Sequence, residues 1–209
     1  MVKKTSSIWL WLWIPLVFII CQLGLELFAP KPMLTRIHSE NGPHEFLQFI
    51  IMVMAVFVAG HALSYKSIRK SPGLGAWFIL AFIGAFYVAG EEISWGQHIF
   101  EWSSPEFWKQ INDQQETNLH NTSSWLDQKP RLLLEIGVMA GGTIIPLLNR
   151  YRRQMLPRQF DSIYLPLTLV PVALIVLFLK VSDKALEALD IQFFTRVSEV
   201  IELTTYYYV

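Results

Sequence analysis

Two adjacent carboxylates, Glu91 and Glu92, stand where a long apolar stretch of the sequence ends. They belong to the segment Gly-Glu-Glu-Ile-Ser-Trp-Gly-Gln-His at 90–98, which directly follows the apolar residues 74–89. A charged side chain at the end of a membrane helix is costly unless it is paired, bound to a metal ion or in contact with water. The sequence therefore indicates that these carboxylates have partners.

A second polar segment, Gln-Glu-Thr-Asn-Leu-His-Asn at 115–121, supplies another carboxylate and an imidazole. Glu116 and His120 are four residues apart, so they would share a face if the segment is helical. A helix continued through the first segment would likewise carry one polar stripe: Glu91, Ser94, Trp95 and His98. The dense run of Asn, Gln, Glu and His also suits a hydrogen-bonded loop, and that alternative stays open.

Carboxylate and imidazole together favour a hard or borderline metal ion, here Zn, Mn or Fe. The expected ligands of this metal site are Glu91, Glu92, Glu116, His120 and His44. Glu92 or Glu116 could act as general base toward a water that the metal ion activates. The single cysteine, Cys21, lies within an apolar run and supports neither a disulfide nor a thiolate cluster.

The elements that must position these groups are long apolar segments. The chain is 53% hydrophobic, and about 20 apolar residues in a helix cross a bilayer. Five runs approach that length: Ile8–Ala29, Phe46–Tyr65, Leu74–Gly90, Leu132–Leu148 and Ile163–Val181. A sixth, Thr195–Val209, is shorter. The sequence predicts an all-α polytopic membrane bundle of five to six transmembrane helices, with residues 1–209 as a single integral membrane domain.

The connection at residues 99–130 is long and carries aromatic residues around Pro105. These residues are Phe100, Trp102, Phe107 and Trp108. Aromatic side chains interleaved with polar ones are typical of a helix that lies in the membrane interface. We therefore expect an interfacial helix within this loop.

Basic residues indicate how the chain is oriented in the membrane. If the N-terminus is cytoplasmic, three inner segments hold a single acidic residue, Asp161, and nine basic residues. The basic residues are Lys3, Lys4, Lys66, Arg69, Lys70, Arg150, Arg152, Arg153 and Arg158. The positive-inside rule then predicts a cell-membrane protein with a cytoplasmic N-terminus. The 99–130 loop would lie on the outer side, periplasmic or extracellular, and the acidic and His residues would meet near the outer leaflet.

The two polar segments resemble a family of uncharacterised bacterial multi-pass membrane proteins. The likeness rests on Gly-Glu-Glu-Ile-Ser-Trp-Gly-Gln and the downstream Glu-Thr-Asn-Leu-His-Asn, and it covers residues 90–121 together with the overall hydropathy. It implies a protein of the bacterial inner membrane with a site in these segments, and it supplies no reaction. The position of His98 is often Arg in that family, which weakens His98 as a ligand.

Three functions are compatible with these patterns. The favoured hypothesis is a metal-dependent enzyme that acts on membrane lipid at the outer leaflet, such as a lipid hydrolase. Three tryptophans could bound a lipid-sized slot: Trp95, Trp102 and Trp108. The first alternative is a non-catalytic subunit or assembly factor that docks to other protein subunits of a membrane complex through the polar segments. The second is an ion- or proton-coupled transporter. No basic stripe or motif indicates nucleic-acid binding.

Overall fold

The computed structural model describes residues 8–37, 39, 42–112, 115–119, 122, 124–191 and 197–208. The structure is 82% helical, and the described residues form no strand. The predicted all-α class is therefore confirmed.

The chain divides into two compact units, which are described separately. The first unit joins Met1–Thr35 to Ile136–Tyr208, and the second comprises Arg36–Glu135 with Val209. The long helix α8 (Ser124–Tyr151) contributes residues to both units. A single integral membrane domain over residues 1–209 therefore remains a prediction.

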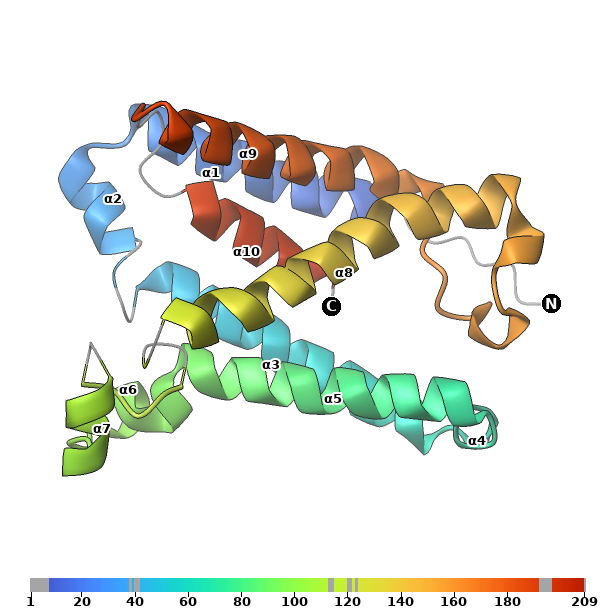
Figure 1. Cartoon of the computed structure of the whole chain (residues 1–209), viewed down its shortest axis with the longest axis horizontal. Coiled ribbons are helices and arrows are strands. Elements are labelled where there is room, and N and C mark those ends of the chain that lie inside the picture. Colours follow the sequence, from blue (N-terminus) through green and yellow to red (C-terminus); the bar gives the residue numbers. More distant parts are fainter. Residues whose placement is uncertain are drawn as a thin grey trace. The chain divides into compact units, whose positions relative to one another are not determined.

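The second unit is built on a pair of long helices, α3 (Pro43–Ser64) and α5 (Pro72–Glu92), joined through the short α4 (Lys66–Arg69). Figure 1 shows α3 and α5 side by side. Each begins with a proline in its first turn, and the missing N–H of proline costs no hydrogen bond there, because N–H groups of the first turn have no partner within the helix. Because the connection is short, the pair is antiparallel, and α3 begins at the end of the pair where α5 stops.

Beyond α5 the chain forms short turns and not one continuous helix. These are η2 (Ser94–Gly96), α6 (Gln97–Phe100) and α7 (Glu106–Ile111). The predicted helical stripe from Glu91 to His98 is wrong, because the backbone leaves the right-handed helical region at Ser94. Helix α7 lies within the loop that was expected to contain an interfacial helix, and its place in the membrane interface remains a prediction.

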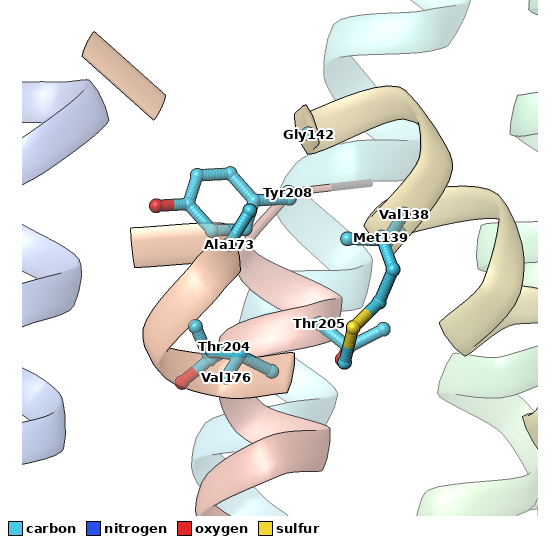
Figure 2. Close-up of a pocket in the computed structure, with 8 residues that line it drawn as sticks. All are labelled: Val138, Met139, Gly142, Ala173, Val176, Thr204, Thr205 and Tyr208. Atoms are coloured by element: carbon cyan, nitrogen blue, oxygen red, sulfur yellow. The ribbon is translucent and has the colours of Figure 1, made fainter. Parts of the chain in front are cut away.

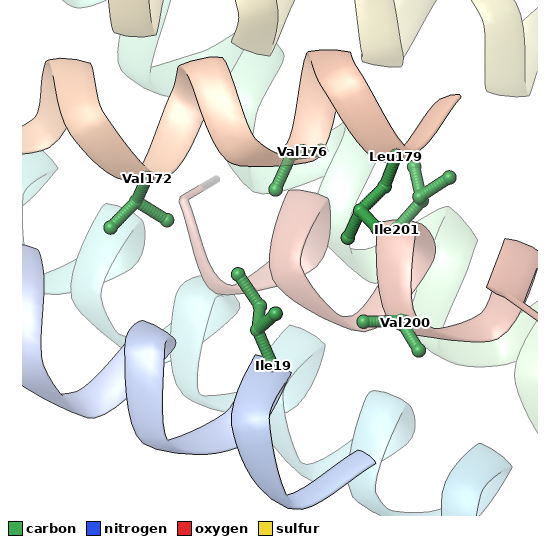
Figure 3. Packing of buried hydrophobic residues seen from close by; sticks show 6 residues of the cluster. All are labelled: Ile19, Val172, Val176, Leu179, Val200 and Ile201. Carbon is green, nitrogen blue, oxygen red and sulfur yellow. The ribbon is translucent and has the colours of Figure 1, made fainter. Parts of the chain in front are cut away.

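The first unit packs four helical elements around an apolar core. They are η1 (Trp9–Trp13), α1 (Ile14–Phe28), α9 (Val170–Ala188) and α10 (Val197–Tyr207). Figure 3 shows the buried side chains from α1, α9 and α10 directed toward one another: Ile19, Val172, Val176, Leu179, Val200 and Ile201. These residues alternate with exposed ones at helical spacing, so each helix contributes one face.

Two tyrosines tie the end of α10 to the start of the described chain. The hydroxyl of Tyr207 donates to the carbonyl of Leu10 at 2.9 Å, and that of Tyr208 donates to the carbonyl of Trp11 at 3.2 Å. The rings of Trp11 and Tyr208 are stacked, with an interplanar angle of 5°. In the first unit, hydrogen bonds between residues 197 positions apart thus join the two ends of the described chain.

Helix α8 approaches α9 closely at Gly142. A Cβ atom at this glycine would lie 2.9 Å from the Cβ of Ala173, whereas one at Gly141 would meet nothing within 4 Å. Of these two adjacent glycines, Gly142 therefore allows the close packing of α8 against α9. Beside this contact, residues of α8, α9 and α10 line a cavity of about 10 Å³, which has room for no more than a single water molecule (Figure 2).

Three segments are long and apolar enough to cross a bilayer: Trp9–Phe28, Pro43–Ser64 and Pro72–Glu92. These segments overlap the first three predicted runs, and such helices are characteristic of a membrane protein. A total of five to six spans and a cytoplasmic N-terminus remain predictions. The fifth predicted run, Ile163–Val181, is wrong in its first part. There η6 (Leu167–Leu169) follows Pro166, whose backbone is extended, and α9 begins only at Val170.

The remaining short elements lie in connections. Helix α2 (Lys31–Ile37) precedes α3, and two turns, η4 (Arg153–Met155) and η5 (Arg158–Phe160), follow α8. His44 and Glu45 fall in the first turn of α3, directly after Pro43.

Candidate functional site

Glu91 is buried in the last turn of α5, with 4% of its surface exposed. Its Oε1 accepts a hydrogen bond from the indole N–H of Trp95 at 2.7 Å, and its Oε2 accepts one from the backbone N–H of Leu119 at 2.7 Å. Hydrogen bonds to an ionised acceptor are short and contribute about 1.5–3 kcal/mol each. This carboxylate therefore fastens the end of α5 to a residue 28 positions further along the chain.

The turn that follows α5 has an uncommon backbone conformation. Ser94, Trp95 and Gly96 are successive residues with φ of 46°, 55° and 95°. Gly96 adopts this region freely, whereas a residue with a Cβ atom is disfavoured there by about 1–2 kcal/mol. Such conformations persist where the surrounding contacts compensate, and they are concentrated at functional sites. Here the turn allows the Ser94 hydroxyl and the Trp95 indole to reach two buried carboxylates.

The indole of Trp95 rests on Gly90. A Cβ atom at Gly90 would meet three ring carbons of Trp95 at 2.8–2.9 Å. The rings of Phe86 and Tyr87 contact the indole edge-on, with centroids 6.0 Å and 6.2 Å away. The position of Trp95 thus depends on the absence of a side chain at Gly90 and on the acceptor that Glu91 provides.

Glu116 is the second carboxylate of the site and is 8% exposed. Its Oε2 accepts hydrogen bonds from the Ser94 hydroxyl and from the Asn118 side-chain amide, both at 2.7 Å. The amide of Asn118, which is fully buried, also donates to the Ser94 hydroxyl at 2.8 Å. We refer to Glu91, Ser94, Trp95, Glu116 and Asn118 as the polar cap.

Amide side chains hold the chain on either side of the polar cap. The Asn112 amide donates to the side-chain and backbone oxygens of Asn118 at 2.7 Å and 3.0 Å, and its Oδ1 accepts from the backbone N–H of Glu116 at 3.1 Å. Gln97 accepts from the backbone N–H of Thr117 at 2.7 Å and from the Ser104 hydroxyl at 3.2 Å. The polar cap is therefore embedded in a wider network of neutral donors and acceptors.

The structure brings two of the five predicted metal ligands to the same turn. Glu91 binds Trp95, and Glu116 binds its neighbour Ser94. The condition for a helical face shared by Glu116 and His120 is not met over residues 115–119, which are not helical and in which Gln115 has a φ of 59°. The contact of Glu116 with Ser94 comes from tertiary structure and not from helical spacing.

The other predicted ligands have different surroundings. Glu92 is half-buried next to Glu91 at the end of α5. His44 is buried, with 5% exposed, in the first turn of α3, at the same end of the α3–α5 pair. His120 lies outside the described residues, as does the side chain of His98.

The carboxylates of the polar cap serve as hydrogen-bond acceptors. Among the residues that the structure describes, no group of three or more His, Cys, Asp or Glu is arranged to hold a metal ion. Glu91 accepts hydrogen bonds from an indole N–H and a backbone N–H, and Glu116 accepts them from a hydroxyl and a side-chain amide. These donors satisfy the buried carboxylate oxygens that they contact, and they order the chain around them.

Sequence reasoning missed the amides and hydroxyls that complete the network. Asn112, Asn118, Gln97 and Ser104 were not among the candidate site residues, yet all four take part in it. The available signal was the dense polar run at 112–118, which suited a hydrogen-bonded loop as well as a metal site.

An apolar groove adjoins the polar cap, between α3 and α5. Its volume is about 310 Å³, and it is lined by Phe49, Val53, Val56, Phe57, Phe86, Ala89, Gly90, Ile93 and Trp95. Phe57 and Phe86 are 73% and 55% exposed. Trp95 belongs to both features, because its ring lines the groove while its N–H binds Glu91.

Comparison of the chain with protein-family models, with curated proteins and with solved structures finds no match. The resemblance of residues 90–121 to a bacterial membrane-protein family therefore remains a prediction. The function has to be inferred from the polar cap and the groove beside it.

Proposed function

We propose that this protein binds a membrane lipid at the end of the α3–α5 pair, with an acyl chain in the apolar groove and the headgroup beside the polar cap. The observation that carries this proposal is the double role of Trp95, which lines the groove and donates its N–H to the buried Glu91. An apolar cavity that meets a few fixed polar groups is the general form of a binding site for an amphipathic small molecule.

The surroundings of the groove support a hydrocarbon occupant. Helices α3 and α5 are both long and apolar enough to span a bilayer, so a groove between them would open to acyl chains. Its volume of about 310 Å³ lies at the lower end of the range for ligand sites, about 300–1,000 Å³. An acyl chain needs no hydrogen-bond partner, and the lining side chains are apolar.

Photo-crosslinking tests this proposal. The full-length protein is reconstituted in nanodiscs with phosphatidylcholine that carries a diazirine on one acyl chain, and the adducts are mapped by mass spectrometry. We expect adducts on groove residues such as Phe57 and Phe86. Val53→Trp, which fills the groove, should lower adduct formation at Phe86 several-fold.

The matched control places the same residue outside the groove. Val58 is on the same helix, is 66% exposed and does not line the groove, so Val58→Trp should leave the labelling of Phe86 unchanged. Equal labelling of Phe86 in wild type and in both variants would contradict lipid binding in the groove.

We propose metal-dependent hydrolysis of the bound lipid as a second function. One observation favours it: the buried His44 and Glu91 belong to the same end of the α3–α5 pair, next to the groove. With His120, these groups could supply imidazole and carboxylate to Zn, Mn or Fe, which would polarise an ester carbonyl or activate water. Glu92 or Glu116 would then act as general base.

Metal analysis separates this second function from lipid binding alone. Detergent-purified protein should contain a stoichiometric metal ion, His44→Ala should lose it, and wild type should release fatty acid or headgroup from labelled phospholipid. A metal-free wild type that gains no thermal stability from Zn, Mn or Fe and hydrolyses no phospholipid would contradict the enzyme. Lipid binding, or docking of another membrane subunit at the polar cap, would then remain.

A further inference from the structure

The connection between α8 and α9 is folded around one arginine. The guanidinium of Arg153 pairs with the carboxylate of Asp161 and lies over the ring of Tyr164, 5.0 Å from its centroid. It also donates to the carbonyl of Leu156 at 3.4 Å, and Leu156 is buried. The Tyr164 hydroxyl in turn donates to the carbonyl of Pro157 at 2.7 Å. The positive charge of Arg153 is therefore paired within the connection, with the carboxylate of Asp161.

Three other arginines, one in the last turn of α8 and two in the connection, carry charge that the connection does not neutralise. Arg150, Arg152 and Arg158 are exposed. Asp161 is the sole acid between residues 149 and 169, and it is paired with Arg153. Arg150 lies over the ring of Tyr151 at 5.6 Å, a contact that leaves its positive charge in place.

Apolar side chains are exposed among these arginines. Tyr151 is 69% exposed and Met155 is 66% exposed. Aromatic and apolar residues alternating with Arg are typical of segments at the level of the lipid headgroups, where the ring or thioether enters the interface and the cation stays at the phosphate. The exposed face of the connection thus combines a net positive charge with apolar contacts.

We propose that residues 150–158 form a docking surface for the headgroups of anionic phospholipids, with Arg152 and Arg158 as the main phosphate contacts. A guanidinium matches a phosphate because its planar set of donors can form two parallel hydrogen bonds. Tyr151 and Met155 fit a lipid surface better than a dissolved anion, because they would otherwise stay exposed to water. This surface belongs to the first unit, whereas the apolar groove belongs to the second.

Lipid titration of the full-length protein tests this surface. The delipidated protein in a neutral detergent is titrated with phosphatidylglycerol or with phosphatidylcholine, and native mass spectrometry counts the bound lipids. We expect tighter binding of phosphatidylglycerol, weakened by added salt. Each removed charge should weaken that binding about fivefold, so Arg158→Gln should lose about fivefold and Arg152→Gln/Arg158→Gln about 25-fold.

Two further variants distinguish binding from folding. Lys66→Gln/Lys70→Gln removes the same charge from the connection between α3 and α5 and should leave phosphatidylglycerol binding unchanged. Arg153→Gln should lower the melting temperature in both lipids, because it removes the internal ion pair, whereas Arg158→Gln should keep the wild-type melting temperature in phosphatidylcholine.

Three outcomes would overturn the proposal. They are an unchanged affinity of the double arginine variant for phosphatidylglycerol, an equal affinity of wild type for phosphatidylcholine, and a stabilisation by inorganic phosphate as large as that by phosphatidylglycerol. Loss of groove labelling in the photo-crosslinking experiment would not affect it, because the two surfaces share no residue.

Discussion

The two units of this chain join distant segments by different means. In the first unit, apolar side chains of α1, α9 and α10 pack against one another, as Ile19, Val176 and Ile201 do. In the second, the end of α5 is joined to residues 116–119 through hydrogen bonds to the buried carboxylates of Glu91 and Glu116. An apolar core tolerates small changes of shape, whereas a buried polar network requires an acceptor for each donor. The polar cap should therefore be far more sensitive to substitution.

The largest effect is expected from Glu91→Ala. This change leaves the Trp95 indole N–H and the Leu119 backbone N–H without their acceptor, and it should lower the free energy of unfolding by about 3 kcal/mol or more. Denaturant titration of the protein in detergent measures it. The neighbouring Glu92→Ala is the control and should cost much less. If both variants lost the same free energy of unfolding, the hydrogen bonds of Glu91 in the polar cap would contribute no more than a side chain at an ordinary helix end.

Gly90→Ala should have the next largest effect. The added methyl group would meet the Trp95 ring at 2.8 Å, and overpacking of this kind costs about 1–3 kcal/mol. Gly84→Ala, on the same helix, is the control, because a Cβ there meets nothing within 4 Å. That control should be neutral or slightly stabilising, since Ala favours helix over Gly. A neutral Gly90→Ala would show that Trp95 does not rest on Gly90.

A conservative change in the apolar core should cost less. Ile201→Val removes one methylene from a residue that is 1% exposed and should lower the free energy of unfolding by about 0.5–1.5 kcal/mol. The same change at Ile20, which is 65% exposed, should have almost no effect. A loss at Ile201 as large as that of Glu91→Ala would contradict the contrast between the two units.

The smallest effect is expected for an exposed carboxylate. The hydrogen bond and charge of Lys184 hold the pKa of Glu187 below its usual value. Because the folded-state pKa is lowered, any stability from this pair is present at neutral pH and is lost as the pH falls through that pKa. Lys184→Gln should raise the pKa of Glu187 in an NMR titration without a measurable change in melting temperature. A clear drop in melting temperature would show that exposed pairs matter here.

The difference between the units also explains which features the sequence could predict. Long apolar runs predicted the helix class and, at Ile8–Ala29, Phe46–Tyr65 and Leu74–Gly90, the approximate positions of three long apolar helices, because hydropathy and helical periodicity are local properties. The first part of the fifth run was wrongly predicted as helix, because Pro166 and Pro171 prevent a continuous helix there although the residues are apolar.

The polar cap was predicted only in part, because it is formed by non-local contacts. Charge next to an apolar helix requires partners, so the sequence indicated partners for Glu91, which is buried and hydrogen-bonded. Glu116 was predicted as a metal ligand, and the structure shows it buried and hydrogen-bonded to Ser94 and Asn118. Their actual partners depend on the positive φ values of Ser94 and Trp95 and on Asn118, 24 residues from the hydroxyl that it contacts. Helical spacing could not indicate such a turn, and so the predicted stripe and the predicted metal ligand set did not describe it.

The most direct test concerns the link between Glu91 and the groove. Glu91→Gln keeps the shape of the side chain but places an amide NH₂ against one of the two donors, so Trp95 should lose its fixed position. In nanodiscs with the diazirine lipid, we predict several-fold fewer adducts at Phe86 and Trp95 for Glu91→Gln, and wild-type labelling for Glu92→Gln. Wild-type labelling in both variants would contradict the account that the polar cap holds Trp95 at a lipid site.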